Sequence, residues 1–438
     1  MRFDVAIAGA GPGATIAAYV LAKAGLDVIV FERGDSPGAK AMFGGVLYTT
    51  VLKHFFPDFH REGCVERPVV EKRFSMLSKT DEISLGFRFL GFQPPYYNES
   101  FTALRATFDK WLAQKAEEAG ATIITSTVVD EVIQHDGRVV GLRARREEGD
   151  VQANVVVAAD GANSLLAQGA GLRKELPLSA VLGVKEVVSL PREIIEDRFN
   201  LEGDEGAAVE YLGGEATMGI MGAGFIYTNR DTLSVGYGCP LHALKGLAVQ
   251  PHELLNHFKL HPSVRRLLRG TTPEEYSAHL IPELSPQDLP RFVTDGMLVI
   301  GGAAGLVNAN PLFHEGTNMA MASGLLAAEA IIEAHKTGDF SAASLSRYEE
   351  KLRQSFAWQD MLRYQGLTRL GETHPQIFSK YPYVLADVAK DLLAVRDERA
   401  GLQTPKRRLE LAATERFLSE IGLFSFLQDI AAVVKAIL

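Results

Sequence analysis

The sequence predicts an α/β domain that carries an inserted, mostly antiparallel β-sheet and is followed by a helical C-terminal region. The chain opens with a strand–helix–strand pattern, changes to short alternating strands in its middle third, and becomes helical towards its end. Its 438 residues exceed one ordinary domain. We expect a first domain of residues 1–80, 100–175 and 291–340, an inserted domain of 81–99 and 176–290, and a helical region of 341–438.

The composition argues against several classes of protein. A net charge of -9, from 45 basic and 54 acidic residues, provides no basic footprint for nucleic acid. Cys64 and Cys239 are too few for a Cys-ligated iron–sulfur cluster or zinc site, so we expect no metal and interpret both as buried apolar residues. The opening stretch FDVAIAGAG lacks the features of a secretory signal, which favours a cytoplasmic location.

A glycine-rich turn lies within the predicted βαβ unit of residues 3–33. Gly9, Gly11 and Ala14 have GxGxxA spacing, and Glu32 lies at the end of the second strand. Gly9 permits the tight turn, and Gly11 lets the backbone approach a pyrophosphate. Ala14 allows close helix–strand packing, and Glu32 accepts a hydrogen bond from a ribose hydroxyl. This pattern predicts a dinucleotide site but does not distinguish NAD from FAD.

Further elements continue this pattern. A helix is predicted from Phe101 to Ala119, followed by short strands that include an HDG hairpin turn. The apolar strand in NVVVAADGANS ends in a glycine turn, and DGMLVIGGAAG at 295–305 repeats the arrangement. Alternating segments such as TLSVGYG favour an antiparallel sheet between them.

Three segments resemble the FAD-dependent oxidoreductases of the hydroxylase and geranylgeranyl reductase superfamily. LRATFDKWL at 104–112 resembles the arginine-containing helix near the FAD phosphates, with Arg105 as the matching residue. ADGANS at 159–164 matches the Asp-Gly motif, and residues 295–330 match the final flavin segment. The resemblance implies a Rossmann-like FAD-binding fold over nearly the first 340 residues.

The resemblance also implies which residues contact FAD. The helix that begins near Gly316 is expected to direct its positive end at the flavin N1 and C2 carbonyl, which favours an anionic reduced form. The expected contacts are Gly9, Gly11, Pro12, Gly13, Ala14, Glu32, Arg33, Lys40, Gly44, Gly45, Arg105, Val129, Asp160, Gly161, Gly301, Gly302, Gly305, Pro311, Gly316, Thr317 and Asn318.

Gly302 departs from the superfamily pattern, in which an Asp most often hydrogen-bonds the ribityl chain. One lost hydrogen bond costs about 0.5–3 kcal/mol, which is too little to abolish a cofactor held by many contacts. A non-catalytic assembly subunit whose flavin site has decayed stays open as an alternative. The colour of the purified protein separates the two, because bound FAD is yellow.

Longer sequence segments resemble the FixC family more specifically and, more distantly, electron-transfer-flavoprotein:quinone oxidoreductases. They lie at residues 32–59 and 224–238, at 275–283 (EYSAHLIPE) and in the C-terminal IGLFSFLQDI. The resemblance implies an FAD subunit that accepts electrons from an electron-transfer flavoprotein of FixA/FixB type and reduces a membrane quinone. It also implies a ferredoxin-like FixX subunit, a FixABCX-type complex whose electron bifurcation depends on the partners, and a peripheral position on the inner face of the cell membrane.

Several side chains are candidates for contacts with a quinone. His314 lies just before the flavin-facing helix and is either a proton donor, since histidine titrates near neutral pH, or a positional residue. Pro311 shapes the same loop. Phe225, Tyr227 and Tyr237 fit a quinone channel or a sheet core, and we favour the core.

Two further alternatives concern the reaction and the C-terminus. A geranylgeranyl or related prenyl reductase shares the fold, but AGFIYTN at 223–229 lacks the Trp and Pro of the corresponding segment in those enzymes. No stretch is apolar for long enough to cross a bilayer. We expect the amphipathic C-terminal helix to dock on its own domain or a partner rather than to anchor on a membrane surface. Its apolar positions are Leu423, Phe426, Leu427, Ile430, Val434 and Ile437.

Overall fold

The chain divides into two compact units, which are described separately. The computed structural model describes all residues except 1, 42–43, 286, 311–312, 394–405 and 438. Unit 1 comprises Met1–Val69, Gly91–Gly183 and Ser277–Leu362, and unit 2 comprises Val70–Leu90, Val184–Tyr276 and Arg363–Leu438. The region 341–438, expected as one helical part, is therefore divided after Leu362. Residues 70–80, expected in the first domain, lie in unit 2, where residues 70–77 belong to a strand of its sheet.

Unit 1 is built on a mostly parallel, eight-stranded sheet. Its strands are β1 (Arg2–Ala8), β2 (Val28–Phe31), β7 (Thr122–Ile124), β8 (Val129–His135), β9 (Arg138–Ala144), β10 (Asp150–Ala158), β16 (Val293–Thr294) and β17 (Met297–Val299). The order is β16-β17-β10-β1-β2-β7, with the antiparallel pair β8–β9 joined to β10. The central strands are apolar without alternation because both of their faces are buried, as at Val155–Ala158.

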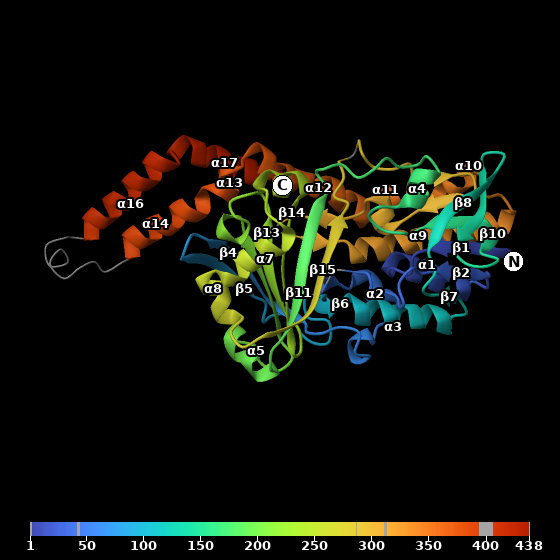
Figure 1. Ribbon diagram of the computed structural model, residues 1–438, viewed down its shortest axis with the longest axis horizontal. Coiled ribbons are helices and arrows are strands. Elements are labelled where there is room, and N and C mark those ends of the chain that lie inside the picture. The colour runs from blue at the N-terminus through green and yellow to red at the C-terminus, as the bar shows by residue number, and fades with distance from the viewer. Residues whose placement is uncertain (1, 42–43, 286, 311–312, 394–405, 438) are drawn as a thin grey trace. The chain divides into compact units, whose positions relative to one another are not determined.

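Helix α1 packs between α3 and α9 in unit 1 (Figure 1). The helices of this unit are α1 (Pro12–Lys23), α2 (Thr50–Phe55), α3 (Arg105–Glu118), α4 (Leu165–Gly169), α9 (Thr317–Thr337), α10 (Ala342–Leu345) and α11 (Arg347–Gln354), with 3₁₀ turns η1 (Phe59–Arg61) and η3 (Gly301–Ala304). Two glycines allow the close approach of α1 and α9. A Cβ on Gly324 would lie 2.0 Å from the carbonyl oxygen of Gly13, and a Cβ on Gly13 would lie 2.6 Å from that of Ala320.

Two short ribbons complete unit 1. They are formed by β3 (Gly44–Tyr48) with β6 (Ser100–Leu104) and by β18 (Asn308–Ala309) with β19 (His314–Glu315). The helix expected from Phe101 begins only at Arg105, because residues 100–104 pair with β3 as a strand. This pairing places Gly44 opposite Leu104 and Gly45 opposite Ala103.

Unit 2 contains a seven-stranded sheet in the order β15-β11-β14-β13-β12-β4-β5. Its strands are β4 (Val69–Leu77), β5 (Glu82–Arg88), β11 (Val181–Ser189), β12 (Gly206–Leu212), β13 (Ala223–Thr228), β14 (Thr232–Pro240) and β15 (Thr272–Ile281), and some cross the boundary between the units by a few residues. The expected antiparallel pairing is confirmed for β12–β13 and β13–β14. Strands β4 and β5 also pair antiparallel, although they lie outside the segment for which this pairing was expected.

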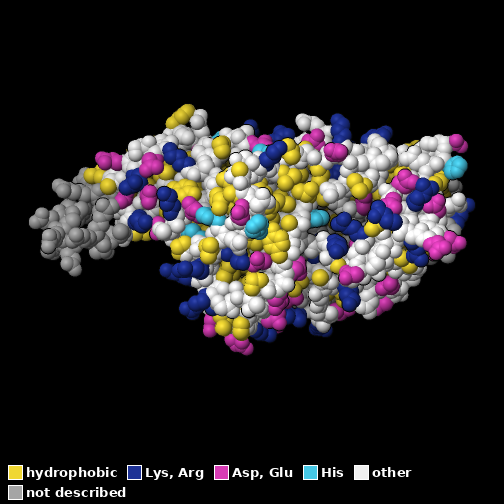
Figure 2. All heavy atoms as spheres, viewed as in Figure 1, with side chains coloured by type: hydrophobic (Ala, Val, Ile, Leu, Met, Phe, Trp, Pro, Cys, Tyr) yellow, Lys and Arg dark blue, Asp and Glu magenta, His cyan; other side chains and the backbone are white. Residues whose placement is uncertain are grey.

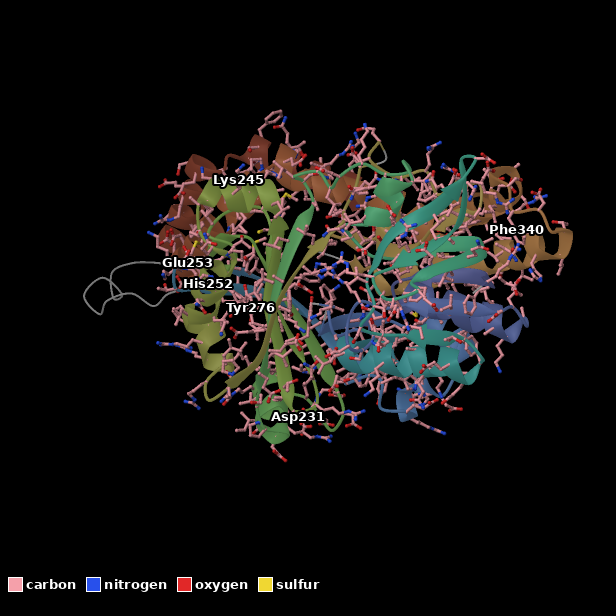
Figure 3. All side chains as sticks on the ribbon, turned by 45° about the vertical axis from the view of Figure 1, so that its right-hand side comes forward. Asp231, Lys245, His252, Glu253, Tyr276 and Phe340 are labelled. Atoms are coloured by element: carbon pink, nitrogen blue, oxygen red, sulfur yellow. The ribbon has the colours of Figure 1, made fainter. Side chains whose placement is uncertain are left out.

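Helices and a 3₁₀ turn accompany this sheet in unit 2. They are α5 (Arg192–Phe199), α6 (Leu241–Leu247), α7 (Pro251–Leu260) and α8 (Pro262–Leu267), with the 3₁₀ turn η2 (Gly214–Ala216). Phe258 of α7 packs against Tyr211. Glu253, labelled in Figure 3, lies in the first turn of α7, and its side chain accepts a hydrogen bond from the Gln250 amide, which caps the helix. Tyr227 and Tyr237 are buried, as the core interpretation predicts.

The C-terminal helices of unit 2 are α12 (Phe356–Thr373, which begins in unit 1), α13 (Gln376–Ser379), α14 (Tyr381–Leu393), α16 (Lys406–Glu420) and α17 (Leu423–Ile437). Helix α14 packs on α16, and Gly366 of α12 lies against Ala436 of α17. Among the described residues, no single helix is long and apolar enough to cross a membrane. The bent pair Glu410–Glu420 and Leu423–Ile437, at 72°, meets the criteria of length and composition only when both parts are taken together.

Candidate functional site

The carboxyl ends of four strands bring the predicted motifs to one edge of the unit 1 sheet. Ala8 of β1 pairs with Ala158 of β10 and with Phe31 of β2, and Ala158 also pairs with Val299 of β17, all in parallel register. Each of these residues ends its strand and lies one or two residues before a predicted motif. In open α/β sheets, ligands bind at this edge. The four motifs begin at Gly9, Glu32, Asp160 and Gly301.

The glycine-rich turn between β1 and α1 has the geometry expected of a pyrophosphate site. Gly9 has a φ of +94°, and a Cβ there would lie 2.4 Å from the Ala159 carbonyl oxygen, so only glycine fits. Gly11 has no heavy atom within 4 Å of the position that a Cβ would take, so its backbone faces open space. No side chain caps the N-terminus of α1, which begins at Pro12 and continues with Gly13 and Ala14. Its first amides are therefore available to an anion.

Glu32 connects this turn to the loop that follows β2. Its carboxylate accepts hydrogen bonds from the Ala10 amide at 2.9 Å and the Gly34 amide at 2.7 Å. The Thr127 amide donates to the Glu32 carbonyl oxygen at 2.8 Å, and this brings the start of β8, at Val129, into the same neighbourhood. Carboxylate oxygens accept more than one hydrogen bond, so Glu32 retains capacity for a ribose hydroxyl.

Arg105, expected near the FAD phosphates with a helical salt bridge as the alternative, is paired with Asp109. Its Nε and Nη2 donate to the two carboxylate oxygens of Asp109 at 2.5 and 2.6 Å. Asp109 is buried; burial raises its pKa, and the Arg105 charge opposes that shift. Gly38 packs on the first turn of the same helix, where a Cβ would lie 2.3 Å from the Arg105 carbonyl oxygen. The loop at Gly38 therefore packs closely on the backbone of α3, while the Arg105–Asp109 pair lies within that helix, and the i,i+4 spacing was the signal for the pair.

The remaining predicted residues of this loop are placed as follows. Arg33 and Lys40 are exposed, and Gly45 is buried beside the strand that leads to Arg105. His279, on β15, lies close enough to Arg33 and Arg105 for their charges to lower its pKa, although burial is the larger cause. Three basic side chains therefore gather near the loop that follows Glu32.

The Asp-Gly motif is joined to the last glycine turn by a buried arginine. Asp160 accepts hydrogen bonds from Ser164 Oγ at 2.7 Å and from the Leu166 amide at 3.1 Å. Arg173 is 7% exposed, and its Nη1 donates to the Ala303 carbonyl oxygen at 3.0 Å. Burial lowers the pKa of Arg173, and the charge of Asp160 opposes this change. Burial likewise raises the pKa of Asp160.

Arg173 was missed because a single arginine in a loop carries no burial signal in sequence. Its Nη2 is buried and has no hydrogen-bond partner among the described residues, and the same holds for Nδ2 of Asn308 on β18. Such atoms are rare in folded proteins, and both are N–H donors that suit an oxygen of a water or a ligand.

The final glycine turn presents open backbone at Gly302. The Gly301 amide donates to Ser323 Oγ of α9 at 2.9 Å, and Gly305 ends the turn with a φ of +72°. A Cβ on Gly302 would lie no closer than 3.6 Å to any neighbour, at the Gly161 and Ala162 backbone. Gly302 is therefore not required by the packing, and the backbones of Gly302 and Gly161 lie next to each other.

The N-terminus of α9 is organised by Asn318. Its Oδ1 accepts a hydrogen bond from the Val51 amide at 3.2 Å, and its Nδ2 donates to Glu315 at 2.7 Å and to Thr50 Oγ1 at 2.9 Å. No side chain caps the helix at Gly316, so the amides near Thr317 stay available. His314 is half-buried on β19. Pro311 lies outside the described residues.

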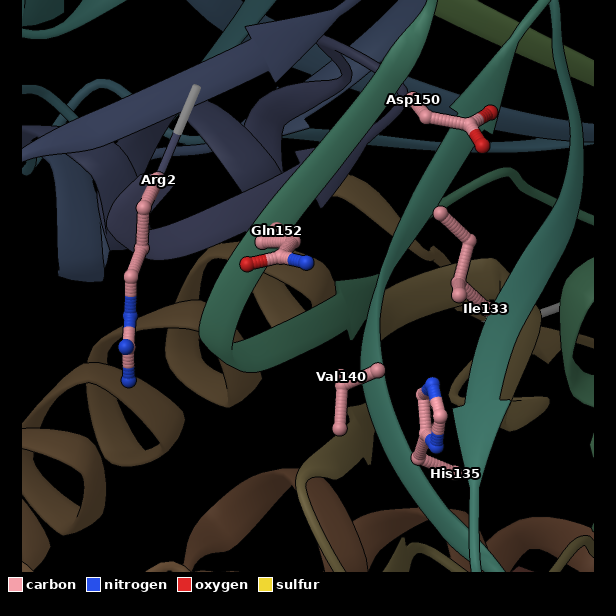
Figure 4. A pocket seen from close by; sticks show the side chains of 6 residues that line it. All are labelled: Arg2, Ile133, His135, Val140, Asp150 and Gln152. Carbon is pink, nitrogen blue, oxygen red and sulfur yellow. The ribbon is translucent and has the colours of Figure 1, made fainter.

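The residues at this edge fit FAD. Gly11, Gly161 and Gly302 all present backbone with room beyond it, two helix N-termini lack side-chain caps, and Glu32 is in place for a ribose. A surface hollow of about 470 Å³ lies elsewhere, beside Arg2 and Asp150 at the amino ends of β1 and β10 (Figure 4). Because nucleotides bind at the carboxyl edge, this hollow is not the cofactor site.

Comparisons with known proteins agree with this assignment. Residues 2–200 match the model of a family described as an FAD binding domain. Protein FixC of Bradyrhizobium diazoefficiens is 40% identical over 421 residues, covering 95% of this chain and 94% of its own. Protein FixC of Azotobacter vinelandii is 38% identical over 435 residues, covering 98% and 97%.

Solved structures show the same fold at low identity. A geranylgeranyl bacteriochlorophyll reductase-like protein from Thermoplasma acidophilum superimposes with a TM-score of 0.71 at 20% identity, covering 99% of both chains. The myxobacterial chondrochloren halogenase CndH gives a TM-score of 0.65 at 20% identity, covering 100% of this chain and 97% of its own. The predicted fold and FAD cofactor are confirmed, and the chain belongs to the FixC family of FAD-dependent oxidoreductases.

Proposed function

We propose that this FAD oxidoreductase accepts electrons from an electron-transfer flavoprotein and delivers them to a membrane quinone. It works as the FixC-like subunit of a FixABCX-type complex, beside a ferredoxin-like subunit, at the inner face of the cell membrane. The observation that carries this proposal is the similarity to FixC proteins over 95% or more of the chain, which includes the phrases at 32–59 and 275–283.

The cysteine content supports this division of labour. The sequence contains two cysteines, and both are buried. Because cysteine-ligated clusters typically use four thiolates, an iron–sulfur cluster in the electron route belongs on a partner chain. Charges of both signs are interspersed over the face shown in Figure 2.

The residues of unit 1 perform binding and positioning tasks. FAD supplies the one-electron and two-electron steps when it is bound. The uncapped N-terminus of α9 contributes positive potential, and Asn318 fixes that helix against α2. His314, on the adjoining β19, is the candidate proton donor to a quinone oxygen.

An anaerobic assay tests the route. The purified protein, its co-expressed electron-transfer flavoprotein and NADH are mixed, and the flavin spectrum is followed after addition of a soluble menaquinone analogue. We expect catalytic reoxidation of the reduced flavin by the quinone, and no flavin reduction when the electron-transfer flavoprotein is left out. If the reduced flavin is not reoxidised by quinone but reduces a geranylgeranyl double bond, the protein is a prenyl reductase instead.

A further inference from the structure

Helix α17 has its polar and apolar sides reversed relative to an ordinary surface helix. Its only acidic residue, Asp429, is 3% exposed. The Asp429 carboxylate accepts hydrogen bonds from the hydroxyl of Tyr381 and from Gln376 Nε2, both in the same unit. The large apolar side chains on the opposite side are 41–76% exposed. These side chains are Leu423, Phe424, Leu427, Ile430 and Val434.

The exposed side chains form one continuous stripe, here called the α17 stripe. Leu423, Leu427, Ile430 and Val434 follow i, i+4, i+7 and i+11 spacing, so they lie on one helix face. The inward side of the helix is held by other residues. Phe426 packs on the rings of Phe417 and Tyr381, with centroid distances of 4.9 and 6.2 Å. The expected docking of this helix on its own domain therefore occurs, but not through most of its predicted apolar face.

The size of the α17 stripe argues against a protein partner. A helix of 15 residues is about 22 Å long and about 10 Å wide. The stripe therefore covers about 220 Å², well below the roughly 800 Å² that each partner buries in a stable protein interface. A lipid surface has no such minimum, because acyl chains adapt their shape to a single helix.

The charge of the helix agrees with a lipid surface. Within Leu423–Ile437, Lys435 is the one exposed charged residue, because Asp429 is turned inward. A cation at the border of an apolar face is attracted to anionic headgroups. The preceding helix also supplies exposed leucines, and the bent pair Glu410–Glu420 and Leu423–Ile437 has the overall hydropathy of a membrane segment.

We propose that α17 lies in the surface of a lipid bilayer, with the α17 stripe among the acyl chains and Lys435 at the headgroups. The helix does not cross the bilayer. The inference rests on the proposed function in one respect, because a membrane quinone is reached from the bilayer. It goes further by assigning the contact to one face of one helix.

A vesicle-binding experiment tests the assignment without any electron donor or quinone. The FAD-loaded protein is sedimented with vesicles of phosphatidylcholine and phosphatidylglycerol. The test variant is Leu427→Gln with Ile430→Gln, and the matched control is Leu178→Gln with Leu260→Gln, which are exposed leucines outside α17. We expect the test variant to partition into vesicles roughly tenfold or more weakly, because two inserted side chains are lost.

Retained FAD absorbance and an unchanged unfolding midpoint show that the test variant is folded. Wild-type protein that stays in the supernatant, or equal loss of binding in both variants, overturns the assignment. It is also overturned if the test variant still binds vesicles but loses electron uptake from the electron-transfer flavoprotein, because the stripe then contacts a protein. Vesicle binding without quinone reduction would refute the proposed function while supporting the bilayer contact.

Discussion

Replacing Gly11 with alanine separates cofactor binding from folding. Gly11 precedes α1, has a φ of -75° that any residue adopts, and has no heavy atom within 4 Å of the position a Cβ would take. The methyl group therefore causes no clash within the protein. It projects from the turn that is expected to hold the pyrophosphate, so it keeps the phosphate oxygens away from the backbone amides of the turn.

The substitution Gly11→Ala is expected to change FAD affinity much more than it changes the stability of the apoprotein. Alanine in place of glycine at a helix N-cap changes stability by less than about 1 kcal/mol. A hydrogen bond to a charged group contributes about 1.5–3 kcal/mol, which corresponds to roughly 10- to 150-fold weaker binding for each one lost. We expect Gly11→Ala to bind FAD at least tenfold more weakly while its apoprotein unfolds at nearly the wild-type urea concentration.

Two titrations measure this difference. FAD is titrated into apoprotein and followed by the quenching of its fluorescence, and the apoprotein is unfolded in urea. Gly246→Ala is the control, because Gly246 in α6 of unit 2 also has no atom within 4 Å of a Cβ. Wild-type affinity in Gly11→Ala would refute the placement of the pyrophosphate at this turn.

Three further changes test other parts of the site. Gly302→Asp should tighten FAD binding by roughly 2- to 10-fold through one added hydrogen bond, since its Cβ has 3.6 Å of clearance; weaker binding in the same titration would contradict this. Arg173→Met should lower the free energy of unfolding by about 1–3 kcal/mol, because the Ala303 carbonyl and Asp160 lose their partner. The exposed Arg291, which also donates to a carbonyl, serves as its control in urea unfolding and should change by less than about 0.5 kcal/mol as Arg291→Met. Burial raises the pKa of Glu315 above its ordinary value of 4.5, so its contribution to stability is full below 4.5 and is lost as the pH rises through the raised pKa. Glu315→Gln should flatten this decline in unfolding experiments above pH 4.5, and an unchanged pH profile would argue against a buried carboxylate.

The dinucleotide-binding part of the fold was predictable because its signals are local. The spacing of Gly9, Gly11 and Ala14 and the distance to Glu32 describe one βαβ unit, and the structure places a parallel strand, a helix and a strand there. Asp160 and Gly301 follow the apolar strands β10 and β17. Strand β10 pairs in parallel with β1 of the βαβ unit, and β17 pairs in parallel with β10. The carboxyl ends of parallel strands lie at one edge of the sheet, regardless of the conformation of the loops between them.

Features that depend on tertiary contacts were not predictable. Arg105 resembled a phosphate contact, yet its guanidinium binds Asp109, and only burial makes that acid an obligatory partner. Arg173 has no local pattern, because its acceptor at Ala303 lies 130 residues away. The predicted start of α3 was wrong because residues 100–104 form a strand that pairs with β3. For Arg173 and for the start of α3, a partner distant in the sequence overrides the local preference, whereas for Arg105 the spacing to Asp109 was visible and only the burial of that acid was not.

The backbone groups around Gly302 explain why the site tolerates glycine, which has no side chain to bind the cofactor. An Asp at this position contributes one side-chain hydrogen bond, whereas the rest of the edge offers backbone groups at Gly11, Gly161 and the N-terminus of α9. Backbone amides are fixed by the strands and helices that precede them, so they bind without loss of side-chain entropy. Removing one flexible contact from such a set lowers affinity by a limited factor. The same reasoning predicts that alanine at Gly11 weakens FAD binding more than aspartate at Gly302 strengthens it, and comparison of the two titrations decides whether backbone or side chains dominate this cofactor site.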